Sequence, residues 1–263
     1  MNEAARPKER YIEYSDSAKA TGDGFRGTAP GGPSAPAKAA PAGVPTVPDY
    51  LQETYRWAYL DSRNAKYLDR EVVVNAILWW QHRRLRRSAL LEIEPGQRVL
   101  QSACVYGNFS PILAERIGPD GRLEVVDVAE VQVRNCRRKL ADYEYATVRH
   151  ENLLYLRDEE FDAVCCYFLL HELPDDCKHG VTRVLLDSVR PGGKVVFVDY
   201  HKPHWVHPLR LVSGAIFDML EPYAKGLWRH EIVEFAGNGE RFDWRKETYF
   251  GGLYQKVVAT RRV

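Results

Sequence analysis

The chain has 263 residues, of which 37 are Lys or Arg, 36 are Asp or Glu, and 45% are hydrophobic. This length suits one catalytic domain with an appendage, and the apolar content is enough to build a core. The formal net charge of +1 argues against a nucleic-acid partner, because the molecule as a whole has no excess of cations to neutralise phosphates.

The five cysteines show no CxxC pair and no zinc-like spacing, so we expect reduced, buried thiols. The sequence shows no secretory leader pattern, and no apolar run approaches the roughly 20 residues that cross a bilayer. We therefore expect a cytoplasmic protein that is soluble or peripherally associated with the inner face of the cytoplasmic membrane.

The N-terminal part divides into two segments. Residues 1–48 mix charge with Gly, Ala and Pro and offer few apolar residues to bury, which predicts a disordered arm. Apolar and aromatic residues return at 49–95, where we predict N-terminal helices that cap the following domain. The second of these helices should run from about 69 to 91.

The predicted helix at 69–91 carries Trp79-Trp80 beside the basic run that begins at His82. A basic, tryptophan-bearing helix can lie on an anionic membrane surface, with its rings at headgroup level. A solvated basic face with both tryptophans in the core explains the same pattern. The sequence leaves both alternatives open.

Strands and helices alternate over residues 96–263. Apolar runs predict strands at 98–102, 122–127, 146–149, 161–167 and 194–200, and helical patterns lie at 108–117, 129–141 and 176–189. This alternation predicts an α/β fold with a doubly wound, mostly parallel sheet and right-handed crossovers. Two β-prone runs broken by Gly251-Gly252 within 247–261 predict a closing antiparallel hairpin.

Two positions indicate a nucleoside-type cofactor. The stretch 98–110, RVLQSACVYGNFS, has the pattern of a strand, a tight turn and a helix, which brings backbone N–H groups close to a ligand. Some twenty residues on, the next strand ends in Asp127, where doubly wound folds hydrogen-bond a ribose. Alternatively, Asp127 caps the helix that begins near Ala129.

These motifs resemble those of the class I S-adenosylmethionine (SAM)-dependent methyltransferases. Their first motif is similar to V-L-D-x-G-C-G-x-G, and the chain keeps Val99, Leu100, Cys104 and Gly107 of it. It departs at Gln101, where the acid belongs, and at Ala103 and Val105, where glycines belong. The segments FDAV and LHELPD within 161–175, and VRPGGKV at 189–195, resemble the fourth strand with its loop and the turn before the fifth strand.

The nearest large group is the ubiquinone/menaquinone-biosynthesis methyltransferases. The altered turn V-Y-G-N-F-S, together with H-E-L-P and F-G-G-L-Y-Q, more closely resembles the rhodoquinone-biosynthesis methyltransferase-like proteins. That resemblance implies conversion of the lipid substrate ubiquinone to rhodoquinone, in which an amino group replaces a methoxy group. It further implies SAM as the amino donor and a divalent metal, with manganese favoured.

The resemblance assigns roles to individual residues. A SAM-binding Rossmann-like domain over 96–263 would bind its cofactor through Ala103, Gly107, Asn108, Asp127, Val128, Asn152 and Leu153. The catalytic candidates are Gln101, Tyr106, His171 and Glu172. In the family the acid at the position of Gln101 lies near the ammonium of SAM, so its loss would favour a neutral, nucleophilic amine. The alternative is a degenerate motif in a protein that no longer binds SAM.

Asp199, His201 and Glu172 are the candidate metal ligands. Carboxylates with one or two imidazoles suit manganese better than zinc, and such an ion could polarise a quinone carbonyl. A polar loop with exposed histidines is the alternative, because Pro203 and Pro208 break the spacing. The apolar insertion at about 203–230 would form a trough for a prenyl tail that opens toward the bilayer, or a helix packed on the sheet.

Two other functions fit the same sequence. One is an ordinary SAM-dependent methyltransferase that acts on a quinone precursor. The other is a non-catalytic SAM-binding scaffold subunit. The sequence makes no prediction of the oligomeric state.

Overall fold

The computed structural model describes residues 12–13, 45, 47–56, 58, 62–156, 160–237 and 239–263. Most of the arm predicted at 1–48 therefore lies outside the described residues. Within the described part, no helix has the length and apolar character that crossing a bilayer requires.

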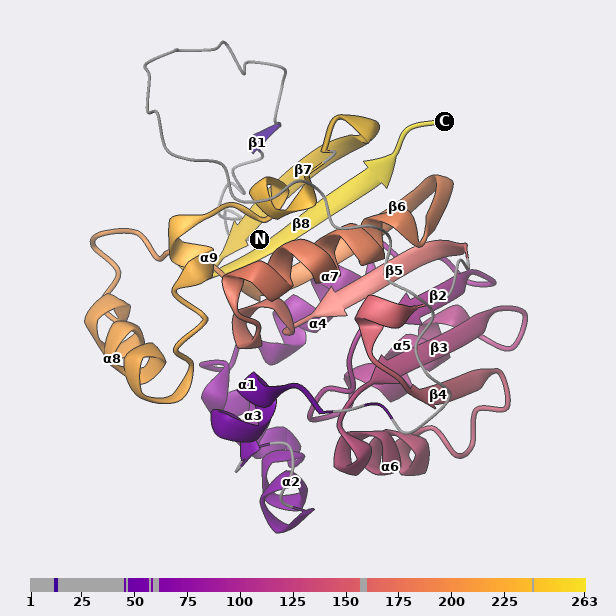
Figure 1. Cartoon of the computed structure of the whole chain (residues 1–263), viewed down its shortest axis with the longest axis horizontal. Helices are drawn as coiled ribbons and strands as arrows, with labels where there is room; N and C mark the ends of the chain where they lie inside the picture. The colour runs from indigo at the N-terminus through magenta and orange to yellow at the C-terminus, as the bar shows by residue number, and fades with distance from the viewer. Residues whose placement is uncertain are drawn as a thin grey trace, which may run out of the picture.

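A single sheet forms the centre of the fold, with the strand order β1-β7-β8-β6-β5-β2-β3-β4 (Figure 1). The strands are β1 (Ile12–Glu13), β2 (Arg98–Gln101), β3 (Arg122–Asp127), β4 (Ala146–His150), β5 (Phe161–Tyr167), β6 (Val189–Tyr200), β7 (Phe242–Tyr249) and β8 (Tyr254–Arg261). β4, β3, β2, β5 and β6 run parallel to one another, whereas β8 is antiparallel to β6 and β7 is antiparallel to β8. The predicted doubly wound, mostly parallel sheet with a closing hairpin is confirmed.

Helices cover both faces of the sheet. They are α1 (Asp49–Glu53), α2 (Ser62–Leu68), α3 (Glu71–Ile77), α4 (His82–Leu90), α5 (Phe109–Ile117), α6 (Glu130–Lys139), α7 (Asp175–Asp187), α8 (Arg210–Leu220) and α9 (Gly226–Arg229). Short 3-10 helices lie at η2 (Leu153–Tyr155), η3 (Leu170–Glu172), η4 (Ile232–Ala236) and η5 (Gly239–Arg241). α4, α5 and α6 bury residues in the cluster on one face, and α7 and η4 bury residues in the cluster on the other.

The apolar periodicity explains these layers. Alternate strand residues such as Val99 and Leu100 pack into opposite core clusters, as a sheet buried on both faces requires. The strands and helices predicted between 98 and 189 agree with the structure to within two residues at each end. β6 differs, because it begins at Val189 rather than at 194, with a register shift between Phe161 and Ala163 of its partner.

The RPGG motif forms that irregular start of β6. Gly192 has a φ of +78°, a backbone conformation that favours glycine. A Cβ at Gly193 would lie 2.7 Å from the carbonyl oxygen of Asp162 on the neighbouring strand. Only glycine allows this close approach, so the motif holds β6 against β5.

The prediction of one helix over 69–91 is wrong. α3 ends at Ile77 and α4 begins at His82, because Trp79 and Trp80 adopt φ values of +49° and +59°. The Trp80 N–H donates to the carbonyl of Asn75 at 2.7 Å, which closes the end of α3. Trp79 packs on the core and Trp80 is 73% exposed, so the alternative with both tryptophans in the core holds for Trp79 alone.

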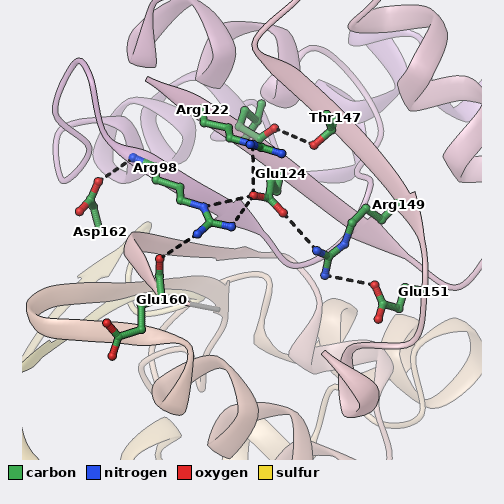
Figure 2. Close-up of polar contacts among 9 residues, drawn as sticks. Arg98, Arg122, Glu124, Thr147, Arg149, Glu151, Glu160 and Asp162 are labelled. Atoms are coloured by element: carbon green, nitrogen blue, oxygen red, sulfur yellow. Dashed lines mark hydrogen bonds and ion pairs between the residues drawn. The ribbon is translucent and has the colours of Figure 1, made fainter. Parts of the chain in front are cut away.

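The buried carboxylate of Glu124 links β2, β3 and β4, the three strands nearest the β4 edge of the sheet (Figure 2). Glu124 on β3 is 2% exposed, and its Oε1 lies 2.8 Å from Arg98 Nη2 and 3.4 Å from Arg122 Nε. Its Oε2 lies 3.2 Å from Arg149 Nη1 on β4. Three arginines therefore neutralise one buried charge and link β2, β3 and β4.

Candidate functional site

A cavity lies at the carboxyl ends of β2, β3 and β5. β2 pairs with β3 on one side and with β5 on the other, so the loops after these strands meet where doubly wound folds bind ligands. The N-terminal helices complete the wall with apolar residues of α1, α3 and their flanks. Aromatic side chains form much of the lining: Tyr50, Tyr106, Tyr167, Phe168 and Tyr200.

Asp127 ends β3 and lines this cavity. Its Oδ2 accepts the backbone N–H of Cys104 at 2.8 Å, and its Oδ1 accepts the N–H of Ala129 at 2.7 Å. Burial raises the pKa of Asp127 to about 6, although both N–H groups act in the opposite direction. Asp127 can therefore cap the following helix and still bind a ribose, because each carboxylate oxygen has a second lone pair for a ligand hydroxyl.

The turn after β2 is held by a partly buried ion pair that the sequence reasoning missed. Lys139 Nζ lies 2.9 Å from Asp69 Oδ1 and also donates to the carbonyls of Val105 and Gly107. Asp69 Oδ1 in turn accepts the N–H of Gly107 at 3.0 Å. This network joins the turn between α2 and α3 to α6 and fixes the loop after β2.

The loop after β4 supplies the third part of the cofactor wall. Val128, Asn152 and Leu153 all line the cavity, as expected of cofactor-binding residues. The Asn152 Oδ1 accepts the N–H of Leu154 at 3.0 Å and so caps η2. Its side-chain NH₂ group keeps two donors for a ligand acceptor.

His171 and Asp199 form a buried pair across two loops. Asp199 Oδ1 lies 2.9 Å from His171 Nδ1, and Asp199 Oδ2 accepts the His171 backbone N–H at 3.3 Å. Glu172 Oε1 lies 3.8 Å from His171 Nε2, and both His171 and Glu172 line the cavity. Burial lowers the pKa of His171, but the negative charge and hydrogen bond of Asp199 outweigh it and raise that pKa to about 9. His171 can therefore donate a proton from Nε2 at neutral pH.

Glu221 is a further acid in the cavity that sequence reasoning did not find. It follows α8, and its charge acts on His171 together with that of Glu172. Burial raises the pKa of Glu221, and its side chain hydrogen-bonds to Tyr55, which follows α1. An acid within the apolar segment 203–230 is the only local signal for it.

Comparisons with known proteins agree with this geometry. A model of the methyltransferase domain family matches residues 99–193. The demethylmenaquinone methyltransferases of Halalkalibacterium halodurans and Bacillus cytotoxicus are 29% and 28% identical over 145 and 190 residues. These matches cover 52% and 70% of this chain and 58% and 76% of the relatives, so the chain spans less than two thirds of the first relative's length.

Among solved structures, the N-methyltransferase NodS of Bradyrhizobium japonicum in complex with S-adenosyl-L-homocysteine is similar, with a TM-score of 0.53 at 13% identity. The match covers 81% of this chain and 99% of that one. Residues 99–193 therefore match a methyltransferase domain, and the chain shares its fold with this N-methyltransferase. Its cavity lies at the place that the fold reserves for a ligand.

The cavity has the chemistry that a SAM molecule requires. Asp127 presents a carboxylate for ribose hydroxyls, and the backbone around Cys104 approaches it closely. Ala103 and Val105 replace two glycines of the first motif and still line the cavity. The adenosyl group would lie between this turn and the loop at Asn152 and Leu153.

Gln101 does not line the cavity. Its amide is fully buried, and its Nε2 donates to the carbonyl of Ala103 at 2.6 Å and to Ser110 Oγ at 2.9 Å. Since strand residues alternate between faces, Gln101 at the end of β2 packs behind the turn. The side chain therefore shapes the loop, and the direct effect on the SAM amine that we expected has no support in this geometry.

Three further residues of the turn after β2 differ in whether they reach the cavity. Tyr106 lines the cavity, and its hydroxyl donates to the carbonyl of Ala58. Burial raises the pKa of Tyr106, which makes its phenolate unfavourable. Gly107 and Asn108 lie outside the lining, because Gly107 at φ +79° turns the chain into α5 and Asn108 accepts a hydrogen bond from Arg86.

The three candidate metal ligands do not converge. His201 Nδ1 lies 2.8 Å from the carbonyl of Gly252, and its Nε2 lies 2.9 Å from Lys246 Nζ. Asp199 instead bonds His171 and the Tyr200 N–H. No group of three His, Cys, Asp or Glu side chains in the described part of the chain has the arrangement to hold a metal ion. The residues present therefore do not fit the expected manganese site.

Proposed function

We propose that this protein is a SAM-dependent transferase that acts on the ring of a prenylated quinone and converts ubiquinone to rhodoquinone. The observation that carries the proposal is the His171–Asp199 pair, because His171 lines the same aromatic cavity as the carboxylate of Asp127. The quinone class is supported by relatives named demethylmenaquinone methyltransferase. Exchange of a methoxy group for an amino group is supported by the sequence resemblance.

The proposed chemistry follows from the charge of this pair. When bound, SAM supplies an amine nitrogen as the nucleophile. Asp199 holds His171 protonated, so Nε2 can donate to a ring carbonyl oxygen and draw electron density away from the ring carbon. Attack by that amine would form a C–N bond at the carbon that bears the methoxy group, and the C–O bond would break as methanol leaves with a proton from the amine. Cleavage of the bond between this nitrogen and the α-carbon of SAM, with transfer of a proton from the adjacent carbon to nitrogen, would then leave an amino group on the ring and release an unsaturated SAM skeleton. Glu172, at 3.8 Å from Nε2, is placed to accept a proton during this exchange.

Methyl transfer to a quinone precursor is the second candidate, and the names of the relatives favour it. In that reaction the site must remove a proton from a ring hydroxyl rather than supply one. A histidine held protonated by Asp199 is less suited to that role, whereas Glu172 and Glu221 could serve as the base. The two reactions thus place different demands on the same residues.

The deciding experiment uses the whole chain with short-tailed ubiquinone and SAM labelled with nitrogen-15 on its amino group, with and without manganese chloride. Mass spectrometry of the quinone should show the label in an aminoquinone. A methylated precursor without label, in a parallel assay, would replace amination by methyl transfer. If neither product forms, the protein is better described as a non-catalytic SAM-binding scaffold.

Matched variants test the residues that carry the proposal. Asp199→Asn should lower the rate of amination at pH 7 by at least tenfold, because His171 loses the charge that keeps it protonated. Glu231→Gln removes an acid that pairs with a different histidine, His201, and should leave the rate within about twofold. Equal amination rates in Asp199→Asn and the wild type would show that His171 is not the proton donor.

A lipid substrate also requires access from a bilayer, and we propose peripheral contact at the inner face of the cytoplasmic membrane. Ile77, Trp80 and Met219 are 50%, 73% and 74% exposed, and Ile77 also lines the cavity. Exposed Arg83 and Arg84 next to Trp80 supply the charge that anionic lipids attract. Trp80→Ser should reduce cosedimentation with phosphatidylglycerol vesicles, whereas Leu91→Ser, at the far end of α4, should not. Equal binding by both variants would reject this surface.

A further inference from the structure

His82 is a buried polar side chain that the chemistry described so far does not use. It is the first residue of α4 and shares the inner face of that helix with Leu85 and Ala89. The side chain is 0% exposed and lines the cavity. Within the described residues neither ring nitrogen, Nδ1 or Nε2, has a hydrogen-bond partner.

Keeping an imidazole in this state is unfavourable for folding. A buried donor or acceptor without a partner loses its hydration and gains nothing in return. The backbone that places His82 is also strained, because Trp79 and Trp80 both adopt left-handed conformations that bulky residues avoid. Two unfavourable features at one point of the cavity wall indicate a role in binding.

The ring of His82 is neutral at physiological pH. Burial lowers the pKa of His82 to about 4, with further lowering by the positive charges of Arg86 and Arg83 against an opposing effect of Glu71. A neutral imidazole offers one N–H donor and one nitrogen acceptor. It can therefore bind a carbonyl or a hydroxyl oxygen, and it does not attract an anion by charge.

A second polar group without a hydrogen-bond partner among the described residues lines the same cavity. Tyr167, at the end of β5, lines the cavity, and its hydroxyl has no hydrogen-bond partner within the described residues. Its ring stacks on Phe109 with centroids 4.0 Å apart, which fixes the direction of the hydroxyl. The charge of Arg86, one turn after His82, acts on both His82 and Tyr167, and both side chains line the cavity.

We infer that His82 and the Tyr167 hydroxyl bind ring oxygens of an uncharged quinone or quinol. Apolar side chains of Val74, Leu78 and Phe168 line the same cavity and suit a flat, uncharged ring. A carboxylate or phosphate would meet no lysine or arginine here, since none of the described residues that line the cavity is basic in this way. This inference rests on the proposed function, and it names the groups that orient the ring toward His171.

The test separates ring binding from cofactor binding. Ubiquinone with one isoprene unit and S-adenosylhomocysteine serve as the two probes, each titrated into the wild type and four variants by calorimetry. His82→Leu removes both nitrogens, and Tyr167→Phe removes one oxygen while keeping the stacked ring. His82→Gln restores a donor and an acceptor, and His179→Leu removes an exposed histidine outside the cavity.

The expected result is a Kd for the quinone about tenfold higher in His82→Leu and in Tyr167→Phe, with partial recovery in His82→Gln. The Kd for S-adenosylhomocysteine should change by less than twofold, and the thermal midpoint of His82→Leu should equal or exceed that of the wild type. A merely structural histidine would instead lower the midpoint and weaken both probes together.

Two results would overturn the inference in distinguishable ways. If the wild type binds the quinone and His82→Leu and Tyr167→Phe bind it equally well, the pair does not hold the ring, and the proposed function stands. If the wild type binds S-adenosylhomocysteine but no quinone, the inference and the proposed substrate fail together.

Discussion

Replacement of His82 by leucine should change the pH dependence of stability in a way that the structure fixes. At pH 8 the imidazole is neutral in the folded and the unfolded chain, and leucine removes two unpartnered nitrogens from a fully buried position. Relief of such a group stabilises a protein by about 1 to 3 kcal/mol. We therefore expect His82→Leu to be at least as stable as the wild type at pH 8.

The difference should grow as the pH falls. The folded pKa of about 4 lies below the ordinary value of 6.5, so the unfolded chain binds the proton more tightly. The free energy of unfolding of the wild type therefore falls progressively as the pH falls from 6.5 toward 4, because protonation of His82 favours the unfolded chain. With these two values the loss at pH 5 is about 2 kcal/mol. His82→Leu has no imidazole to protonate at this position. The difference in free energy of unfolding between the variant and the wild type should therefore increase by the same amount between pH 8 and pH 5.

Urea unfolding followed by tryptophan fluorescence at pH 8, 7, 6 and 5 measures this change. His179→Leu removes an exposed histidine and should keep a constant free-energy difference from the wild type, to within about 0.5 kcal/mol. Parallel pH curves for His82→Leu and the wild type would show that the imidazole is hydrated in the folded protein. The argument from its unpartnered nitrogens would then be refuted.

Three further predictions concern other parts of the structure. Asp127→Asn should weaken S-adenosylhomocysteine binding by at least tenfold in calorimetry, and wild-type binding should decline below pH 6, where the carboxylate becomes protonated; a flat profile would exclude Asp127 from the site. Gln101→Glu should lower the thermal midpoint, because a carboxylate would oppose the Ala103 carbonyl at the present 2.6 Å hydrogen bond; an unchanged midpoint would show that the loop does not depend on the amide. Glu124→Gln should lower the free energy of unfolding by about 2 kcal/mol by leaving partly buried arginines without a counter-charge, whereas Asp243→Asn, at an exposed pair, should change it by less than about 0.5 kcal/mol; equal effects in urea unfolding would contradict the distinction.

Local patterns in the sequence were sufficient for the parts of the fold that depend on local geometry. The alternation of apolar runs predicted the parallel sheet, and Asp127 at the end of the second strand predicted an acid in the cavity wall. Such features follow from side-chain periodicity and from the fact that parallel strands end at one edge of a sheet. The same reasoning placed His171 and Glu172 beside that edge.

Packing between distant segments decided the rest. The sequence could not show that Gln101 faces Ser110 rather than a ligand, or that His201 contacts Lys246 on β7. The break at Trp79-Trp80, which turns His82 into the cavity, opposes local helical periodicity and exists only because the surrounding core holds it. Burial and partnership are properties of the folded chain, since each depends on side chains far apart in sequence. The sequence by itself therefore determined where a cofactor would bind, and tertiary structure decided which polar groups remain available for a second substrate.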